Sequence, residues 1–183
     1  ASGSESKNMA AGGWIQAGNP NEHAGLDFMM RMGKDITLDV YAHLYLSDDD
    51  NSFGLYGAYF WNFYLKAVPA DLGRMGFYVG PTAGLGLWDV EYFVDAALAN
   101  DRYWWRGEFG FAIRFGVTGG FQWEFPVIPL QLYIELSPVG EFQYISWEDE
   151  HYLGTRRIDY REDSDIHWAL PEFYLRVGVR FWF

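Results

Sequence analysis

The sequence contains no cysteine, which excludes disulfides, thiolate metal sites and a lipid-modified cysteine. It also lacks any run near the roughly 18 consecutive apolar residues of a membrane-spanning helix, so a helical membrane protein is excluded as well. Positive charge is scarce: 13 lysines and arginines stand against 25 aspartates and glutamates, for a net charge of −12. This acidity predicts that nucleic acid is not a partner.

The first residues, ASGSESKNMA, are small and polar and show no signal-peptide pattern. We interpret residues 1–10 as a flexible mature N-terminal segment. The length of 183 residues is typical of one domain, which we place at residues 11–183.

Aromatic residues and glycines are abundant, with 9 Trp, 13 Tyr, 15 Phe and 21 Gly. Large apolar side chains recur at every second position, and glycine or polar residues stand between them. The last residues, FYLRVGVRFWF, show this pattern from Phe173 to Phe183. A period of two is typical of a β-strand with two unlike faces.

The pattern predicts eight strands and no helix. The expected strands are 11–18, 24–32, 35–46, 52–65, 76–88, 108–123, 130–145 and 173–183. Short connections (33–35, 66–75 and 124–129) alternate with polar ones (18–22, 47–52, 89–106 and 146–170). Short turns at one end and long polar loops at the other are typical of bacterial outer-membrane barrels. We therefore expect an all-β fold, an eight-stranded antiparallel up-and-down transmembrane β-barrel.

Volume indicates which face of the barrel points inward. An eight-stranded barrel holds only enough side chains to fill it, or one small ligand. The apolar faces carry far more bulk than that, whereas the opposite faces are rich in Gly, Ala and Thr. The apolar residues should therefore face lipid.

Aromatic residues also gather where the strands should leave the membrane. We expect an aromatic girdle at the periplasmic interface, of the kind found in membrane barrels. Its members are Trp61, Phe63, Trp123 and Phe125.

The end of the chain resembles the family of small outer-membrane barrels. Arg176, Gly178, Phe181 and Phe183 match the polar–x–Gly–x–x–aromatic–x–Phe ending of that family, in which it is the assembly signal read by the barrel assembly machinery. After residue 10 the chain resembles the OmpA/OmpX-type barrels, and Gly18-Asn19-Pro20 resembles an early turn in small barrels of uncharacterised function. The resemblance implies a fold and a bacterial outer-membrane location, but no activity. No peptidoglycan-binding domain is found, so that role is not implied.

Charged residues occupy the inward faces of the expected strands. Buried charges persist only when they are paired, so we interpret them as a lumen ion-pair network that plugs the barrel. The members are Asp27, Arg31, Asp39, His43, Glu108, Arg114, Glu135, Glu141, Glu172, Arg176 and Arg180.

The expected outer loops hold 15 acids and five arginines, which places most of the negative charge on one side. These loops could simply keep the outer rim soluble, or they could bind a partner. Asp48, Asp49 and Asp50 are a weak candidate for a metal site, because they lack the spacing of a calcium loop. We expect no metal and no cofactor.

The sequence leaves three functions open. The first is a non-enzymatic structural or surface-interaction protein whose partners are outer-membrane lipid, the assembly machinery and an envelope or extracellular protein bound through the loops. The second is a narrow pore for small solutes. The third is a lipid hydrolase or acyltransferase, for which Asp39 and His43 with Ser47 are the nearest arrangement. No catalytic motif is recognisable, so we expect no enzyme.

Overall fold

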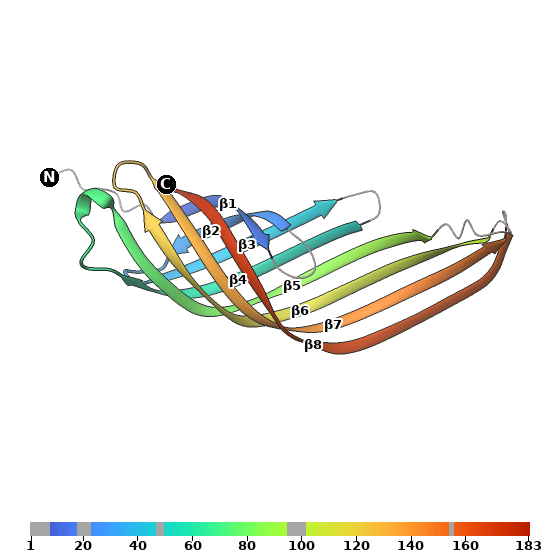
Figure 1. Ribbon diagram of the computed structural model, residues 1–183. Coiled ribbons are helices and arrows are strands. Elements are labelled where there is room, and N and C mark those ends of the chain that lie inside the picture. Colours follow the sequence, from blue (N-terminus) through green and yellow to red (C-terminus); the bar gives the residue numbers. More distant parts are fainter. Residues whose placement is uncertain (1–7, 18–22, 47–49, 95–101, 154–155) are drawn as a thin grey trace.

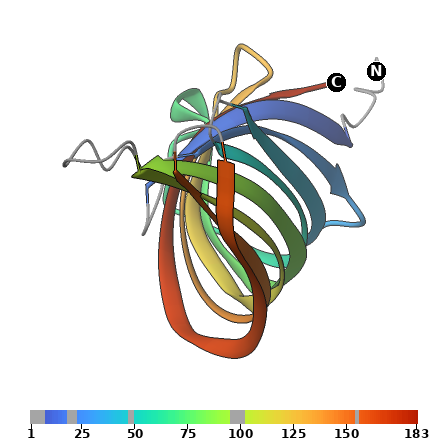
Figure 2. The same ribbon diagram turned by 90° about the vertical axis from the view of Figure 1, so that its right-hand side faces the viewer.

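The computed structural model describes residues 8–17, 23–46, 50–94, 102–153 and 156–183. Each strand pairs antiparallel with its neighbour in sequence, and β1 also pairs with β8, so the sheet closes into a barrel (Figures 1 and 2). The expected eight-stranded antiparallel barrel is confirmed. The strands are β1 (Met9–Ala17), β2 (His23–Arg31), β3 (Ile36–Leu46), β4 (Asp50–Tyr64), β5 (Arg74–Val94), β6 (Arg102–Glu124), β7 (Leu130–Leu153) and β8 (Arg156–Trp182).

The outer surface of the barrel is apolar. Leu26 is 72% exposed, Phe63 is 59% exposed and Phe181 is 57% exposed, although each would be buried in an ordinary soluble domain. Their neighbours in sequence point into the barrel. A closed sheet with such a belt is stable only where hydrocarbon surrounds it.

Glycines on the inward face make room for aromatic rings from the neighbouring strands. A Cβ on Gly178 would lie 2.3 Å from Tyr133, and one on Gly25 would lie 2.4 Å from Trp14. In the same way, a Cβ on Gly84 would lie 2.2 Å from the Tyr56 ring. Each ring thus occupies the space that a side chain at the glycine would need. This explains why the inward face is rich in glycine.

The start of β1, the end of β8 and the short connections 33–35, 66–75 and 124–129 lie at one end of the barrel (Figure 1). The short helix η1 (Ala70–Leu72) and a turn at Gly73, with φ of 90°, connect β4 to β5 at this end. Glycine adopts that φ without the strain that other residues incur. Among the residues described, no helix is long and apolar enough to cross a membrane.

Strands β5 to β8 continue far beyond β1 to β4 (Figure 1). At about 3.3 Å per residue, the 24 residues of β7 span roughly 80 Å. The hydrocarbon core of a bilayer is about 30 Å thick. We call the continuing parts, 90–94, 102–109, 144–153 and 156–167, the outer sheet.

The outer sheet corrects two expectations. Residues 89–106 and 146–170 were predicted to be loops, but most of them extend the flanking strands; residues 95–101 and 154–155 lie outside the described part. The prediction was wrong because it ended each strand where apolar alternation ended. Above the membrane neither face needs to be apolar, and the pairing continues through cross-strand partners such as Glu108 and Trp147.

Candidate functional site

The centre of the lumen is built around Arg180 on β8. Its Nε lies 2.6 Å from Asp27 Oδ2, and its Nη2 lies 2.6 Å from Asp39 Oδ2 and 3.6 Å from Glu135 Oε1. All four side chains are 0% exposed. One guanidinium thus binds carboxylates from the consecutive strands β2 and β3 and from β7, which is distant from them in the sequence.

Tyrosines complete the coordination of these carboxylates. Tyr133 donates a hydrogen bond of 2.7 Å to Asp27, and Tyr78 donates one of 2.7 Å to Glu135. Tyr133 also lies under the Arg180 guanidinium, whose Cζ is 3.7 Å from the ring centre. These contacts fix the rings and the charges together.

Arg176 lies two inward positions further from the chain end than Arg180, with Gly178 between them. Its Nη1 is 3.3 Å from Glu135 Oε2, and its Cζ is 3.6 Å above the Tyr41 ring. Glu135 therefore contacts both lumen arginines of β8, Arg176 and Arg180. The five charged groups of this centre are three carboxylates and two guanidiniums.

A separate ion pair lies in the lumen closer to the outer sheet than the Arg180 centre does. Arg114 on β6 contacts Glu141 on β7 through two bonds, Nε to Oε2 at 2.5 Å and Nη2 to Oε1 at 3.3 Å. Arg114 also donates to the Tyr56 hydroxyl. Gln143 donates to Glu141 at 2.6 Å. This bidentate pair balances its own charge.

The periplasmic end of the lumen holds Glu124, which the sequence prediction placed in a turn. Arg31 Nη2 lies 2.5 Å from Glu124 Oε1, and Arg74 Nη1 lies 3.6 Å from Oε2. The Arg31 guanidinium also lies 3.7 Å above the Trp182 ring. Continuing the inward alternation of β6 from Gln122 by two residues would have placed Glu124 here.

A small cavity separates the Arg176 level from the Arg114 level. Its volume is about 20 Å³, enough for one water molecule. Its lining combines polar groups with apolar carbon surface and includes both arginines. The other lining residues are Gln16, Tyr41, Tyr56, Thr82, Ala83, Ser137, Val139 and Tyr174.

The remaining predicted lumen residues have different surroundings. His43 is buried, with its ring stacked on Tyr56 at 5.9 Å and edge-on to Trp14 at 6.2 Å, whereas Asp39 binds Arg180. Glu108 accepts a bond of 3.1 Å from Trp88 near the outer mouth. The backbone of Glu172 pairs with Val139, but its side chain lies outside the described residues.

Several neutral polar residues of the lumen were missed at the sequence level. Gln131 donates to Gln122, which donates to Asn62, and Asn62 donates to Thr37. Thr118 and Ser137 form another pair at 2.7 Å. All lie at inward positions, so the alternation alone would have found them if neutral residues had been included.

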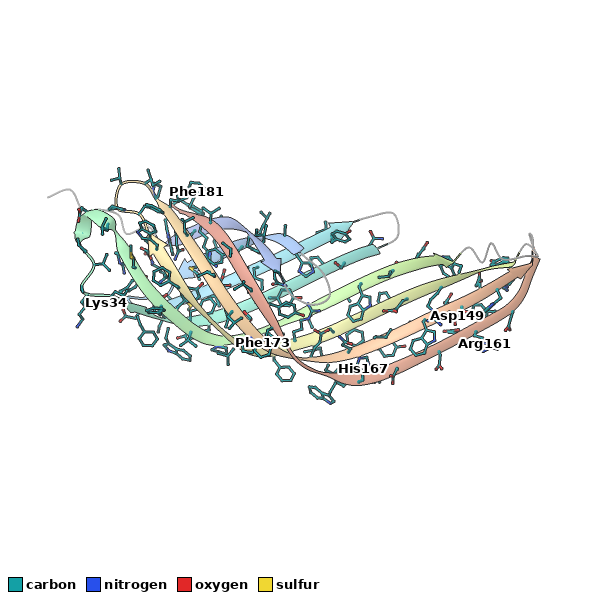
Figure 3. The ribbon with its side chains drawn as sticks, viewed as in Figure 1. Lys34, Asp149, Arg161, His167, Phe173 and Phe181 are labelled. Atoms are coloured by element: carbon teal, nitrogen blue, oxygen red, sulfur yellow. The ribbon has the colours of Figure 1, made fainter. Side chains whose placement is uncertain are left out.

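The outer sheet has its own ion pairs. Arg106 on β6 binds Asp149 on β7 through Nε and Nη2, at 2.5 and 2.8 Å (Figure 3 labels Asp149). The hydrogen bonds from Arg106 are the main reason that the pKa of Asp149 lies below its ordinary value. Arg157 Nη1 lies 2.7 Å from Glu150 Oε1, and Arg161 Nε lies 3.4 Å from Asp159 Oδ2.

Solved structures resemble this barrel over nearly its whole length. The N-terminal barrel domain of Pseudomonas aeruginosa OprF matches with a TM-score of 0.50 and 12% identity, covering 97% of this chain and 98% of that domain. Neisserial surface protein A matches with a TM-score of 0.41, 16% identity and coverage of 96% and 95%. A major outer membrane protein of Thermus thermophilus matches with a TM-score of 0.44, 10% identity and coverage of 96% and 98%.

This chain folds as a small outer-membrane β-barrel. At 12% identity the likeness to the OprF domain concerns the fold alone. No protein-family model matches the sequence, and no curated protein matches it significantly. The fold and the exposed apolar belt together give this barrel the outer-membrane location that the sequence predicted.

The predicted girdle residues of the outer-membrane barrel lie at its periplasmic end. Trp61 is 46% exposed and Phe63 is 59% exposed on the lipid side of β4. The Trp123 and Phe125 rings stack 4.4 Å apart, and Trp123 donates to the Leu72 carbonyl of η1. At the other end, Trp88 and Glu108 share a hydrogen bond on the inner face of the sheet, so Trp88 does not belong to a lipid-facing girdle.

The four residues of the predicted assembly signal divide between the two faces of β8. Arg176 is buried in the lumen and Gly178 seats Tyr133, whereas Phe181 and Phe183 are each 57% exposed outside. The charged side chain of this signal thus lies in the lumen, and its two phenylalanines face the lipid.

No metal site is seen in the described residues. No group of three or more His, Cys, Asp or Glu side chains there could hold a metal ion. The weak candidate Asp48 and Asp49 lies outside these residues, and Asp50 begins β4.

Proposed function

We propose that this protein is a non-enzymatic surface-interaction protein, in which a closed barrel anchors the outer sheet above the membrane. The observation that carries the proposal is the Arg180 centre. One fully buried guanidinium holds carboxylates from three strands across the lumen. A solute would have to break these contacts to pass, at the cost of exposing unpaired buried charges.

Further observations support a plugged lumen. The cavity above Arg176 holds about 20 Å³, with the Arg114–Glu141 pair above it and the Arg180 centre below it. The acidic outer sheet is then the part of the molecule that can meet a partner. The belt would contact outer-membrane lipid, and the β8 ending would be read by the assembly machinery during biogenesis.

Planar-bilayer recording tests the plug. The native protein should give no steady conductance, and Arg74→Ala, which changes a half-exposed arginine at the periplasmic end, should behave in the same way. A steady native conductance that Arg176→Ala or Glu135→Ala alters would instead establish the narrow pore, the second candidate.

The enzyme candidate has a separate test. Expression of the protein in a Gram-negative host should leave the mass of lipid A unchanged. A mass change that His43→Ala abolishes would contradict the proposal. The geometry favours the non-enzymatic role, because the Asp39 carboxylate binds Arg180 and the His43 ring is packed between Trp14 and Tyr56.

A further inference from the structure

The outer half of β8 has a strand neighbour on one side only. β7 pairs with β8 from Arg156 to Phe181, but β1 pairs with it only from Leu175 to Trp182. In the part of the chain that the structure describes, no other strand pairs with this side of β8. We call Arg157–Trp168 on this side the β8 edge; in Figure 1 it lies at the margin of the outer sheet. An unpaired edge offers N–H and C=O groups to another chain.

The direction of the edge N–H groups follows from the barrel. At the end of β8, the inward residue Trp182 donates its N–H toward β7, to Pro129, whereas the outward residue Phe183, which follows β8, donates toward β1, to Met9. L-residues keep this relation between face and N–H direction along a strand. Residues of the outer half that share the outward face, such as Tyr160, therefore direct their N–H groups to the unpaired side.

Aspartates cover these N–H groups. Asp159 accepts from the N–H of Tyr160 at 3.0 Å, Asp163 from Ser164 at 2.8 Å and Asp165 from Ile166 at 2.8 Å. Each acceptor is the carboxylate of the preceding residue. The edge donors are thus held by movable anionic side chains, and no second strand holds them.

The surroundings of the edge are strongly acidic. Residues 146–153 and 156–168 contain seven acids and three arginines. Arg157 and Arg161 contact Glu150 and Asp159. In the described residues no arginine lies within ion-pair distance of Asp163 or Asp165. Positive charge on a partner would be attracted here.

We propose that the β8 edge binds an extended basic segment of a partner protein, which adds a strand beside β8. This inference rests on the proposed surface-interaction role and names the chemistry of its partner. Lysines or arginines of the segment draw the Asp159, Asp163 and Asp165 carboxylates away, and the released N–H groups bind the carbonyls of the incoming strand.

The aspartates also make the edge selective. A neutral or acidic strand would have to displace them without supplying a cation, so their N–H groups stay covered. Two copies of the acidic edge repel one another for the same reason. Tyr160, Ile166 and Trp168 are 42%, 60% and 66% exposed on the outward face beside the edge, where they can contact apolar side chains of a bound strand.

Peptide binding to the full-length protein in nonionic detergent tests the proposal. The probe is a short, fluorescently labelled peptide of alternating lysine and valine, followed by anisotropy. Its control has the same sequence with N-methylated amides along one edge, which keeps the charge but removes strand pairing. The unmodified peptide should bind at least about tenfold more tightly than the methylated one. A glutamate–valine peptide should not bind.

Protein variants locate the site. Ser164→Pro removes an N–H that points away from β7, so it blocks the edge and leaves the β7–β8 ladder in place, with Ser164→Ala as its control. Asp163→Asn with Asp165→Asn removes charge while keeping acceptor oxygens. Both changes should weaken binding about tenfold or more. Glu148→Gln, an acid on β7, should leave it nearly unchanged.

Three results would overturn the proposal: equal binding of the methylated peptide, binding that Ser164→Pro leaves intact, or self-association of the protein that Ser164→Pro abolishes. The last would make a second copy the occupant. Failure here is distinct from failure of the proposed function. If the peptide does not bind but the protein shows no conductance in bilayers, the plugged barrel is retained and the proposed strand addition at the β8 edge is rejected.

Discussion

At the scale of single residues, the lumen is a set of fitted shapes as much as a set of charges. The Tyr133 hydroxyl is fixed by its 2.7 Å bond to Asp27, and its ring lies where the Cβ of any larger residue at position 178 would stand. Gly178→Ala should therefore destabilise the protein by about 1–3 kcal/mol, since the ring cannot retreat without losing that bond. Heat-modifiable gel migration or urea unfolding measures the change.

Gly119→Ala is the matched control for this prediction. A Cβ there would have no heavy atom nearer than 3.7 Å, so the change should be nearly neutral or slightly stabilising. Equal stability of the two alanine variants would show that the space between residue 178 and the Tyr133 ring can accommodate a methyl group.

Arg180 offers a second prediction at this scale. Replacing it with methionine keeps much of its volume but leaves three buried carboxylates with Arg176 as their nearby cation. Breaking a buried pair costs about 3–5 kcal/mol, so Arg180→Met should lower the free energy of unfolding by that order. Arg74→Ala, at a side chain that is 53% exposed, should cost about 0–1 kcal/mol in the same urea titration. A similar cost for both would contradict the central role of Arg180.

The alternation of apolar and polar residues determines how well the sequence predicts which side chains face the lumen. It placed Asp27, Asp39, Glu135 and Arg180 on the inward face because one-residue shifts would have exposed apolar neighbours to the lumen. It did not reveal which acid meets which arginine, since that depends on the stagger between strands. It missed Glu124 because a Phe-Pro sequence follows directly and suggested that the strand had already ended.

At the scale of elements, the same strands serve two environments. Within the membrane, β5 to β8 alternate apolar and small residues, and above it both faces carry polar side chains. Periodicity of hydrophobicity disappears there, although pairing does not. The lengths of these four strands were therefore not predictable from apolar alternation, whereas the lengths of β2 and β3 were.

The outer sheet should depend on pH through Asp149. Its pKa is lowered in the folded protein, chiefly by hydrogen bonds from Arg106, so the carboxylate stabilises the sheet above the ordinary value of 3.8. That contribution is lost as pH falls below 3.8 toward the folded value, when the proton breaks the pair. Because Arg106 is 40% exposed, water screens the pair and the effect should be about 0.2–1 kcal/mol.

Hydrogen exchange of the amides near Asp149 measures this effect. After correction for intrinsic rates, protection at neutral pH should exceed protection in acid by up to about fivefold. Arg106→Gln should remove the difference, while the membrane part of β6 supplies an internal control that should not change. A pH dependence that persists in Arg106→Gln would assign it to another group.

At the scale of the whole molecule, apolar side chains cover the outside of the barrel and charged side chains fill its lumen, which suits the barrel to a membrane. Trp61 is 46% exposed on the belt, and Trp14 is 4% exposed inside the lumen. In vesicles of brominated lipid, tryptophans in contact with acyl chains lose fluorescence by direct collision, but those inside the barrel do not. Trp61→Phe should therefore lower the quenched share of the emission, and Trp14→Phe should raise it. The opposite pair of shifts would mean that the apolar faces converge on the centre, which would overturn the membrane orientation of every strand at once.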